Sequence, residues 1–78
     1  MFSYTVSKNA DKKMFDKACA LIEEKLKLFE KKDILEDVDG SQIQIYNTSN
    51  GNIKVLNDYE VDAVYVDSEV NLNHVFSF

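Results

Sequence analysis

One amphipathic stretch, Ala10–Lys31, constrains the fold of this chain more than any other feature. Its hydrophobic side chains recur at intervals of three and four residues, which places them on about half of a helix circumference. Asn9 is the expected N-cap of this helix. A hydrophobic face this broad needs a large apolar partner, and in a chain of 78 residues only a sheet can supply it. The face consists of Met14, Phe15, Ala18, Cys19, Leu21, Ile22, Leu26, Leu28 and Phe29.

The rest of the chain shows the two-residue alternation of strands. Strands are expected at residues 2–6, 41–48, 52–56, 60–67 and 70–78. The sequence therefore predicts an α+β fold of the order βαββββ, with one long helix packed on one face of a mainly antiparallel five-stranded sheet. Residues 1–78 are expected to form a single α+β domain, close to the lower size limit for independent folding.

The hairpin at Asn50-Gly51 decides which strand residues face the helix. A three-residue loop, Ser49–Gly51, would pair Ile45 with Val55 and gather the aliphatic side chains on one face. A two-residue loop at Asn50-Gly51 would instead place these side chains on opposite faces. We therefore predict the three-residue loop. It places toward the helix Ile43, Ile45, Ile53, Val55, Val61, Ala63, Tyr65 and Leu72.

The opposite face of the sheet is the candidate functional surface. Hydrophobic side chains would lie there among carboxylates and amides, as in a protein interface. Scattered surface hydrophobic residues, which are common, are the alternative interpretation. The candidate protein-binding residues are Tyr46, Leu56, Asp62, Val64 and Val66, together with Asp37 and Asp39 of an acidic loop.

That loop, DILEDVDG at residues 33–40, carries four carboxylates, as the calcium-binding loops of EF-hands do. With Gly40 at the sixth position of such a loop, Asp37 and Asp39 would supply the third and fifth ligands. Leu35 would then occupy the first position and Tyr46 the twelfth, and neither offers a carboxylate. The calcium pattern fails, and the sequence predicts a solvated acidic loop that ends in an Asp-Gly turn.

Other chemistry-bearing residues are sparse. Cys19 lies on the hydrophobic face of the helix, so we expect a buried thiol rather than a nucleophile. His74 is the single histidine, and one histidine with one cysteine cannot form the usual zinc site. The two glycines are isolated, so the chain has no phosphate-binding loop. We therefore expect no enzymatic activity, no cofactor and no metal.

Net charge narrows the range of partners. The formal charge of −5 disfavours nucleic acids and anionic membranes, which attract basic surfaces. Tyr46 and Tyr65 could stack on bases, but few basic residues surround them. No apolar run approaches the roughly 20 residues of a membrane span, and the first residues do not resemble a signal peptide. A cytoplasmic location is expected, since a single cysteine gives no internal disulfide.

Two functions fit these expectations. The first is a small acidic protein-binding module without catalytic activity that acts on a basic protein partner, as inhibitors and immunity-type proteins do. The alternative is a self-associating structural or accessory domain, whose candidate sheet face is covered by a second copy in a two-fold homodimer.

Overall fold

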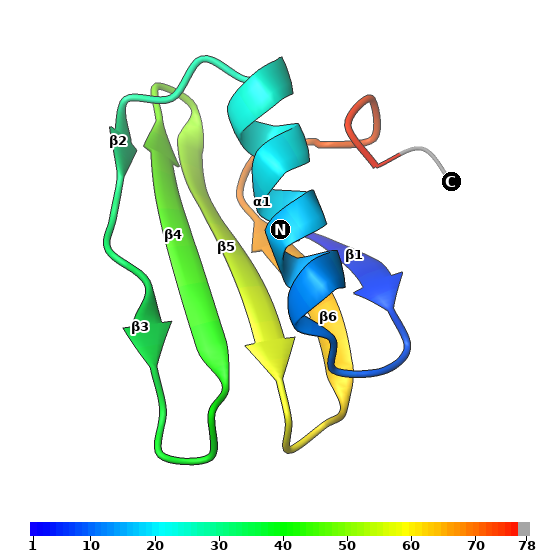
Figure 1. Ribbon diagram of the computed structural model, residues 1–78. Coiled ribbons are helices and arrows are strands. Elements are labelled where there is room, and N and C mark those ends of the chain that lie inside the picture. Colours follow the sequence, from blue (N-terminus) through cyan, green and yellow to red (C-terminus); the bar gives the residue numbers. More distant parts are fainter. Residues whose placement is uncertain (77–78) are drawn as a thin grey trace.

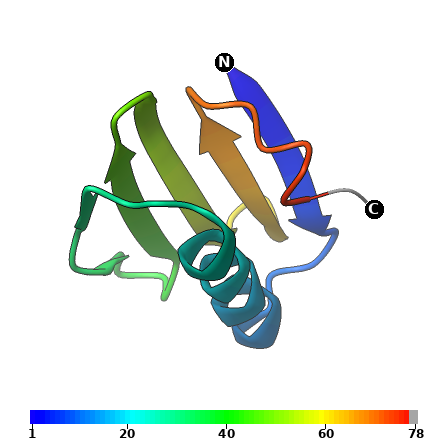
Figure 2. The same cartoon turned by 90° about the horizontal axis from the view of Figure 1, so that it is seen from above.

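The computed structural model describes residues 1–76, in which one helix packs against one face of an antiparallel sheet (Figures 1 and 2). This confirms the predicted α+β class. Within these residues the sheet has six strands in the order β1-β6-β5-β4-β2, and β3 also pairs with β4. The elements are β1 (Phe2–Ser7), α1 (Lys12–Lys25), β2 (Glu30–Lys31), β3 (Leu35–Glu36), β4 (Gln42–Thr48), β5 (Gly51–Asp58) and β6 (Ala63–Ser68).

The helix is shorter than predicted at both ends. Asp11 caps its N-terminus in place of Asn9: its backbone is extended, and its carboxylate accepts a hydrogen bond from the Lys13 amide at 2.8 Å. At the other end Leu26 is extended, and its amide makes the last helical bond to the Ile22 carbonyl at 3.0 Å. The predicted range of Ala10–Lys31 was therefore too long.

The edge of β4 explains why the helix stops early. The Phe29 amide donates to the Asn47 carbonyl at 2.8 Å, and the Lys32 amide donates to the Ile45 carbonyl at 3.0 Å. Between these bonds β2 pairs with β4. An amide that leaves a helix needs another acceptor, and β4 supplies it. Leu28 still packs against the core, so the periodicity marked its burial but not its conformation.

The β4–β5 hairpin differs from its prediction. Thr48 pairs with Gly51, so the loop has two residues, Ser49–Asn50, and Ile45 lies opposite Lys54. The predicted three-residue loop was wrong. Because side chains alternate between faces, this register places Ile45 on the face away from the helix.

Residues of even number in β4 and β6 and of odd number in β5 therefore face the helix. The prediction was correct for β5 but wrong for β4 and β6, where Ile43, Ala63 and Tyr65 lie on the opposite face. Val61, also predicted to face the helix, is 61% exposed in the turn before β6. The buried strand residues are Gln44, Tyr46, Ile53, Val55, Asn57, Val64, Val66 and Ser68, and those of α1 are Phe15, Ala18, Cys19 and Ile22.

Three buried polar side chains on the helix side account for the unexpected register. Asn57 accepts a hydrogen bond from the Asp11 amide at 3.0 Å. The Gln44 side-chain amide donates to the Lys32 carbonyl, and the Ser68 hydroxyl donates to a carbonyl two residues later at 2.7 Å. These bonds attach the sheet to the helix start, to the β2–β3 connection and to the segment after β6. Burial of these polar groups is acceptable because each finds a partner.

The last predicted strand, residues 70–78, is not a strand in the part that the structure describes. The segment after β6 forms a turn in which the Val75 and Phe76 amides donate to the Leu72 carbonyl at 2.9 and 3.0 Å. All three side chains are buried in the core, whereas His74 is exposed. Ser77 and Phe78, the end of that prediction, lie outside the described residues.

The buried Tyr46 hydroxyl makes the stability of the fold depend on pH. Its hydroxyl donates to Oε2 of Glu23 at 2.6 Å. Burial and then this hydrogen bond raise the pKa of Tyr46 far above its ordinary value of 10.0. The contribution of this group to stability is therefore complete below the pKa of the unfolded chain and declines as the pH rises above it, because only the unfolded tyrosine then ionises.

We expect part of the tyrosinate absorbance to appear together with alkaline unfolding followed by circular dichroism. A Tyr46→Phe variant should lose that part of the absorbance change. Ionisation of all tyrosines before the dichroism changes would contradict the buried position of this hydroxyl.

Candidate functional site

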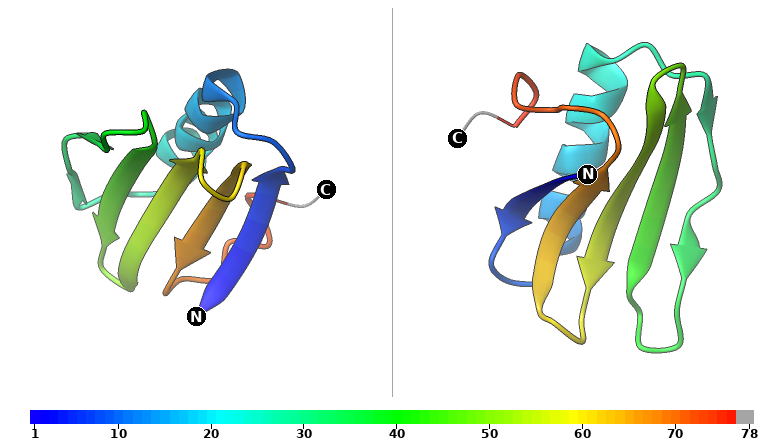
Figure 3. Two further views of the ribbon diagram at one scale, coloured as in Figure 1. Left: turned by 90° about the horizontal axis from the view of Figure 1, so that it is seen from below. Right: turned by 180° about the vertical axis from the view of Figure 1, so that it is seen from behind.

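The sheet face opposite α1, here called the outer face, carries a continuous row of hydrophobic side chains. Strand register places Leu35, Ile43, Leu56 and Tyr65 side by side across β3, β4, β5 and β6. These four residues are the outer row. Ile43, Leu56 and Tyr65 are half-buried, and Leu35 is 56% exposed. Figure 3 shows α1 on the other side of the sheet, so the helix does not cover this row.

The outer row borders a small hollow at the end of β4 and β5, with a volume of about 100 Å³. Ile43 and Leu56 line it together with four carboxylates, and this acidic hollow is the candidate site. Its walls come from two turns, β3–β4 and β5–β6, which lie at the same end of the sheet (Figure 1). The four carboxylates are Asp37, Asp39, Asp58 and Glu60.

A hydrogen bond and a ring contact between the two turns hold the walls together. The Tyr59 amide donates to the Ser41 hydroxyl at 3.0 Å. The Tyr59 ring also lies beside Gly40, where an added Cβ would be 3.5 Å from it. Gly40 has φ 88°, a conformation that favours glycine and completes the turn with a bond from its amide to the Asp37 carbonyl at 3.0 Å. The predicted Asp-Gly turn is therefore confirmed.

Local hydrogen bonds also orient the carboxylates. Asp39 accepts the Ser41 amide at 2.9 Å, and this bond lowers the pKa of its carboxyl. Asp58 accepts the Glu60 amide at 2.9 Å and the Tyr65 hydroxyl at 3.3 Å. Burial, and then the charge of Asp58, raise the pKa of Tyr65, which keeps it a neutral donor. The site therefore holds negative charge beside the end of the outer row.

An apolar floor with acidic walls suits a cation that carries an aliphatic stem. Lysine and arginine side chains combine these features: the stem can lie on Ile43 and Leu56 while the charged group meets a carboxylate. The hollow is smaller than the several hundred Å³ of a typical small-molecule site. Among residues 1–76, no three His, Cys, Asp or Glu side chains are placed to hold a metal ion.

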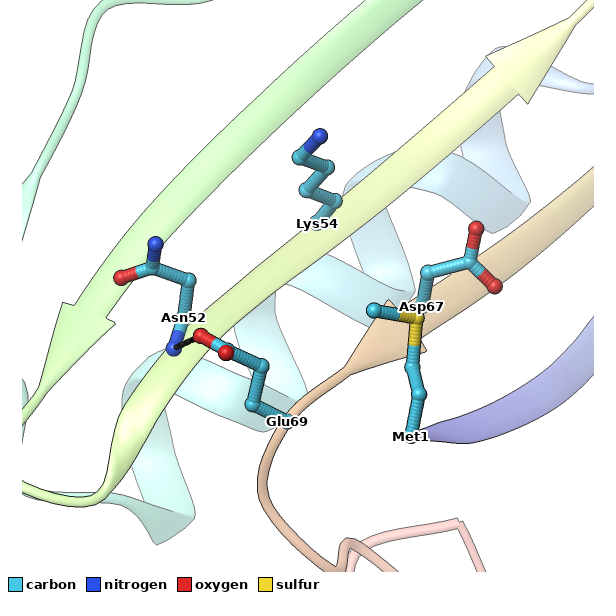
Figure 4. Close-up of a pocket in the computed structure, with 5 residues that line it drawn as sticks. All are labelled: Met1, Asn52, Lys54, Asp67 and Glu69. Carbon is cyan, nitrogen blue, oxygen red and sulfur yellow. Dashed lines mark hydrogen bonds between the residues drawn. The ribbon is translucent and has the colours of Figure 1, made fainter.

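A second hollow of about 240 Å³ lies at the opposite end of the outer face (Figure 4). It mixes charges, because Lys54 and Asp67 extend from neighbouring strands (Figure 4). Its carboxylates also accept internal hydrogen bonds, Glu69 from the Asn52 amide at 2.8 Å and Asp67 from the Ser3 hydroxyl at 2.8 Å. Because Lys54 offsets part of its negative charge, this hollow offers less uncompensated charge than the acidic hollow, whose lining includes no cation.

Three of the predicted site residues are not on the outer face. Tyr46, Val64 and Val66 are wholly buried on the helix side of the sheet, with exposed fractions of 0%. The prediction was wrong because it shifted the faces of β4 and β6 by one residue.

The other predicted site residues divide into two groups. Leu56, Asp37 and Asp39 meet at the acidic hollow. Asp62 is exposed, but it accepts the Ala10 amide at 2.8 Å, a bond that lowers the pKa of its carboxyl and fixes the approach to the helix. Its position is therefore explained by the fold alone.

Sequence reasoning missed Ile43, Tyr65 and Asp58 as members of the candidate surface. It did place Leu56 on the outer face. A signal for Ile43 was present in the hairpin, because a loop of Ser49–Asn50 puts Ile43 opposite Leu56. Nothing in the local sequence indicated that Asp58 would face the acidic loop.

Comparisons of the chain with protein-family models, with curated proteins and with solved structures give no match. No described helix is long and apolar enough to cross a membrane.

Proposed function

We propose that this protein is a protein-binding module without catalytic activity, and that its outer face engages a basic protein partner in the manner of an inhibitor or immunity-type protein. The observation that carries the proposal is the position of the outer row, which runs uncovered across the sheet into the acidic hollow. A hydrophobic centre with a charged rim is the usual composition of a protein interface.

Exposed hydrophobic side chains extend this surface beyond the strands. Val38, at the tip of the β3–β4 turn, is 103% exposed and lies between two aspartates. Tyr59, in the β5–β6 turn, is 47% exposed. Large hydrophobic residues on two neighbouring turns can insert into a partner and contribute most of the binding energy.

The charge of the outer face favours a basic partner over a second copy on this face. Among the side chains that the register places outward on β4, β5 and β6, Lys54 is the one cation. Two copies joined through this face would bring their acidic hollows into one interface. Like charges brought together in this way weaken association, whereas lysine and arginine from a partner would neutralise them.

The proposal is tested by titrating the isotope-labelled protein with a short peptide that contains lysine, arginine and leucine. We expect amide chemical shifts to change at Ile43, Leu56 and Glu60, and the affinity to fall as salt is added. An acidic peptide of the same length serves as the control and should leave these signals in place. Shifts confined to α1 would contradict the proposed surface.

A matched pair of charge reversals tests the site itself. Glu60→Lys places a cation in the wall of the acidic hollow, and we expect it to weaken peptide binding about three- to tenfold. Glu24→Lys makes the same change of charge on the exposed side of α1 and should leave the affinity within about twofold. Equal effects of both variants would show attraction to net charge rather than to this hollow.

A further inference from the structure

The two edges of the sheet are built differently. One edge of β4 is divided between β2 and β3, which have two residues each, and the connection carries Glu30, Lys31, Lys32 and Asp33. Short edge strands and charged side chains are the usual protection against pairing with another chain. The opposite edge is β1, which spans Phe2–Ser7.

β1 lacks these protections. Its sequence, FSYTVS, contains no charged residue and no proline. Within the described residues, β6 is its one paired strand, so its other side presents backbone amides and carbonyls without a strand partner (Figure 1). Phe2 at this edge is 40% exposed. An edge of this kind is a template for β-strand addition.

We propose that β1 pairs with β1 of a second copy, in an antiparallel two-fold dimer that joins the two sheets into one. An antiparallel strand pair is compatible with a two-fold axis, so the same residues serve both chains. The side-chain pattern of β1 is self-complementary. Tyr4 lies opposite Val66 and so faces the helix side with Phe2, while Ser3 and Thr5 face outward.

A register centred on Ser3 places Phe2 opposite Tyr4 and Ser3 opposite Ser3. One centred on Tyr4 places Tyr4 opposite Tyr4 and Ser3 opposite Thr5. Both kinds of cross-strand pair stabilise a sheet, and no like charges meet at the joint. Pairing would also cover Phe2. The outer faces of both copies would lie on the same side of the joined sheet, so this dimer leaves the acidic hollow of each copy accessible.

The test is sedimentation of the full chain at concentrations from micromolar to millimolar. We expect the mass to rise from the 9.0 kDa of the monomer toward twice that value. Thr5→Lys places two cations at the joint and should weaken self-association at least tenfold. Asn50→Lys adds the same charge in the exposed β4–β5 loop and should leave it unchanged. Thr5→Val, which is uncharged and suited to a strand, should keep the dimer.

Circular dichroism establishes that Thr5→Lys still folds. Hydrogen exchange supplies an independent measurement: alternate amides of β1 should exchange more slowly as the protein concentration rises. A wild-type chain that stays monomeric at millimolar concentration overturns the proposal, as does a dimer that is equally sensitive to both lysine variants. Glu60→Lys should dimerise normally, so a failure here is separate from a failure of peptide binding.

Discussion

A Tyr46→Ala variant should lose about 3–5 kcal/mol of unfolding free energy, whereas its neighbour Ile45→Ala should lose about 1 kcal/mol. Tyr46 is wholly buried against α1, and its hydroxyl donates to Glu23 at 2.6 Å. Truncation removes the ring from the core and leaves a cavity beside Cys19. Ile45 is half-buried on the outer face, where water replaces the lost side chain.

The measurement is urea unfolding of the two variants and the wild type, followed by circular dichroism. A chain of 78 residues has roughly 4–12 kcal/mol of stability in total, so Tyr46→Ala could unfold in water. A stabilising osmolyte added to all three samples would then restore a measurable transition. A larger loss for Ile45→Ala than for Tyr46→Ala would reverse the assigned faces of β4.

The contrast between these neighbours also marks the limit of prediction from this sequence. Alternation correctly indicated that residues 41–48 form a strand, but it could not decide which face is buried. Ile43 and Ile45 suggested that their own face is buried, and the polar Gln44 suggested that its face is exposed, but the buried face is that of Gln44. The structure buries Gln44 because its amide finds the Lys32 carbonyl, a contact far from it in sequence.

The buried side of α1 could be predicted from the sequence, but the position of its C-terminal end could not. Periodicity identified Phe15, Ala18, Cys19 and Ile22 as its buried side, and all four are in the core. The C-terminal end could not be predicted because no glycine or proline marks it. It is set by the competition of β4 for the backbone of residues 29–32.

The positions of some predicted site residues could be read from the sequence at one end of the outer face. The acidic loop and Leu56 were identified from composition and alternation, which are local properties. Their meeting with Asp58 and Glu60 depends on the β5–β6 turn, whose position follows from the register of two hairpins. The first hairpin was predicted with an error of one residue, which reversed the faces of β4. The exchange of Tyr65 with Val64 comes from the second hairpin, in which Val55 lies opposite Val66.

We also expect a large loss of stability from a substitution in the segment after β6. Leu72→Ala should cost about 2–5 kcal/mol, although this residue lies in neither a helix nor a strand. Leu72 is wholly buried, and its amide donates to the Tyr4 hydroxyl at 2.7 Å. The Tyr4 ring packs against Phe76 with a centroid distance of 5.7 Å, so this segment and β1 support each other.

Leu35→Ala is the matched control, because it removes the same side chain from a site that is 56% exposed, and it should change stability by less than about 0.5 kcal/mol. Urea unfolding measures both variants. Similar small losses for the two would mean that the last segment contributes little to the core. A large loss for Leu72→Ala alone would show that the sheet needs this irregular segment to complete its buried face, because α1 covers only part of it.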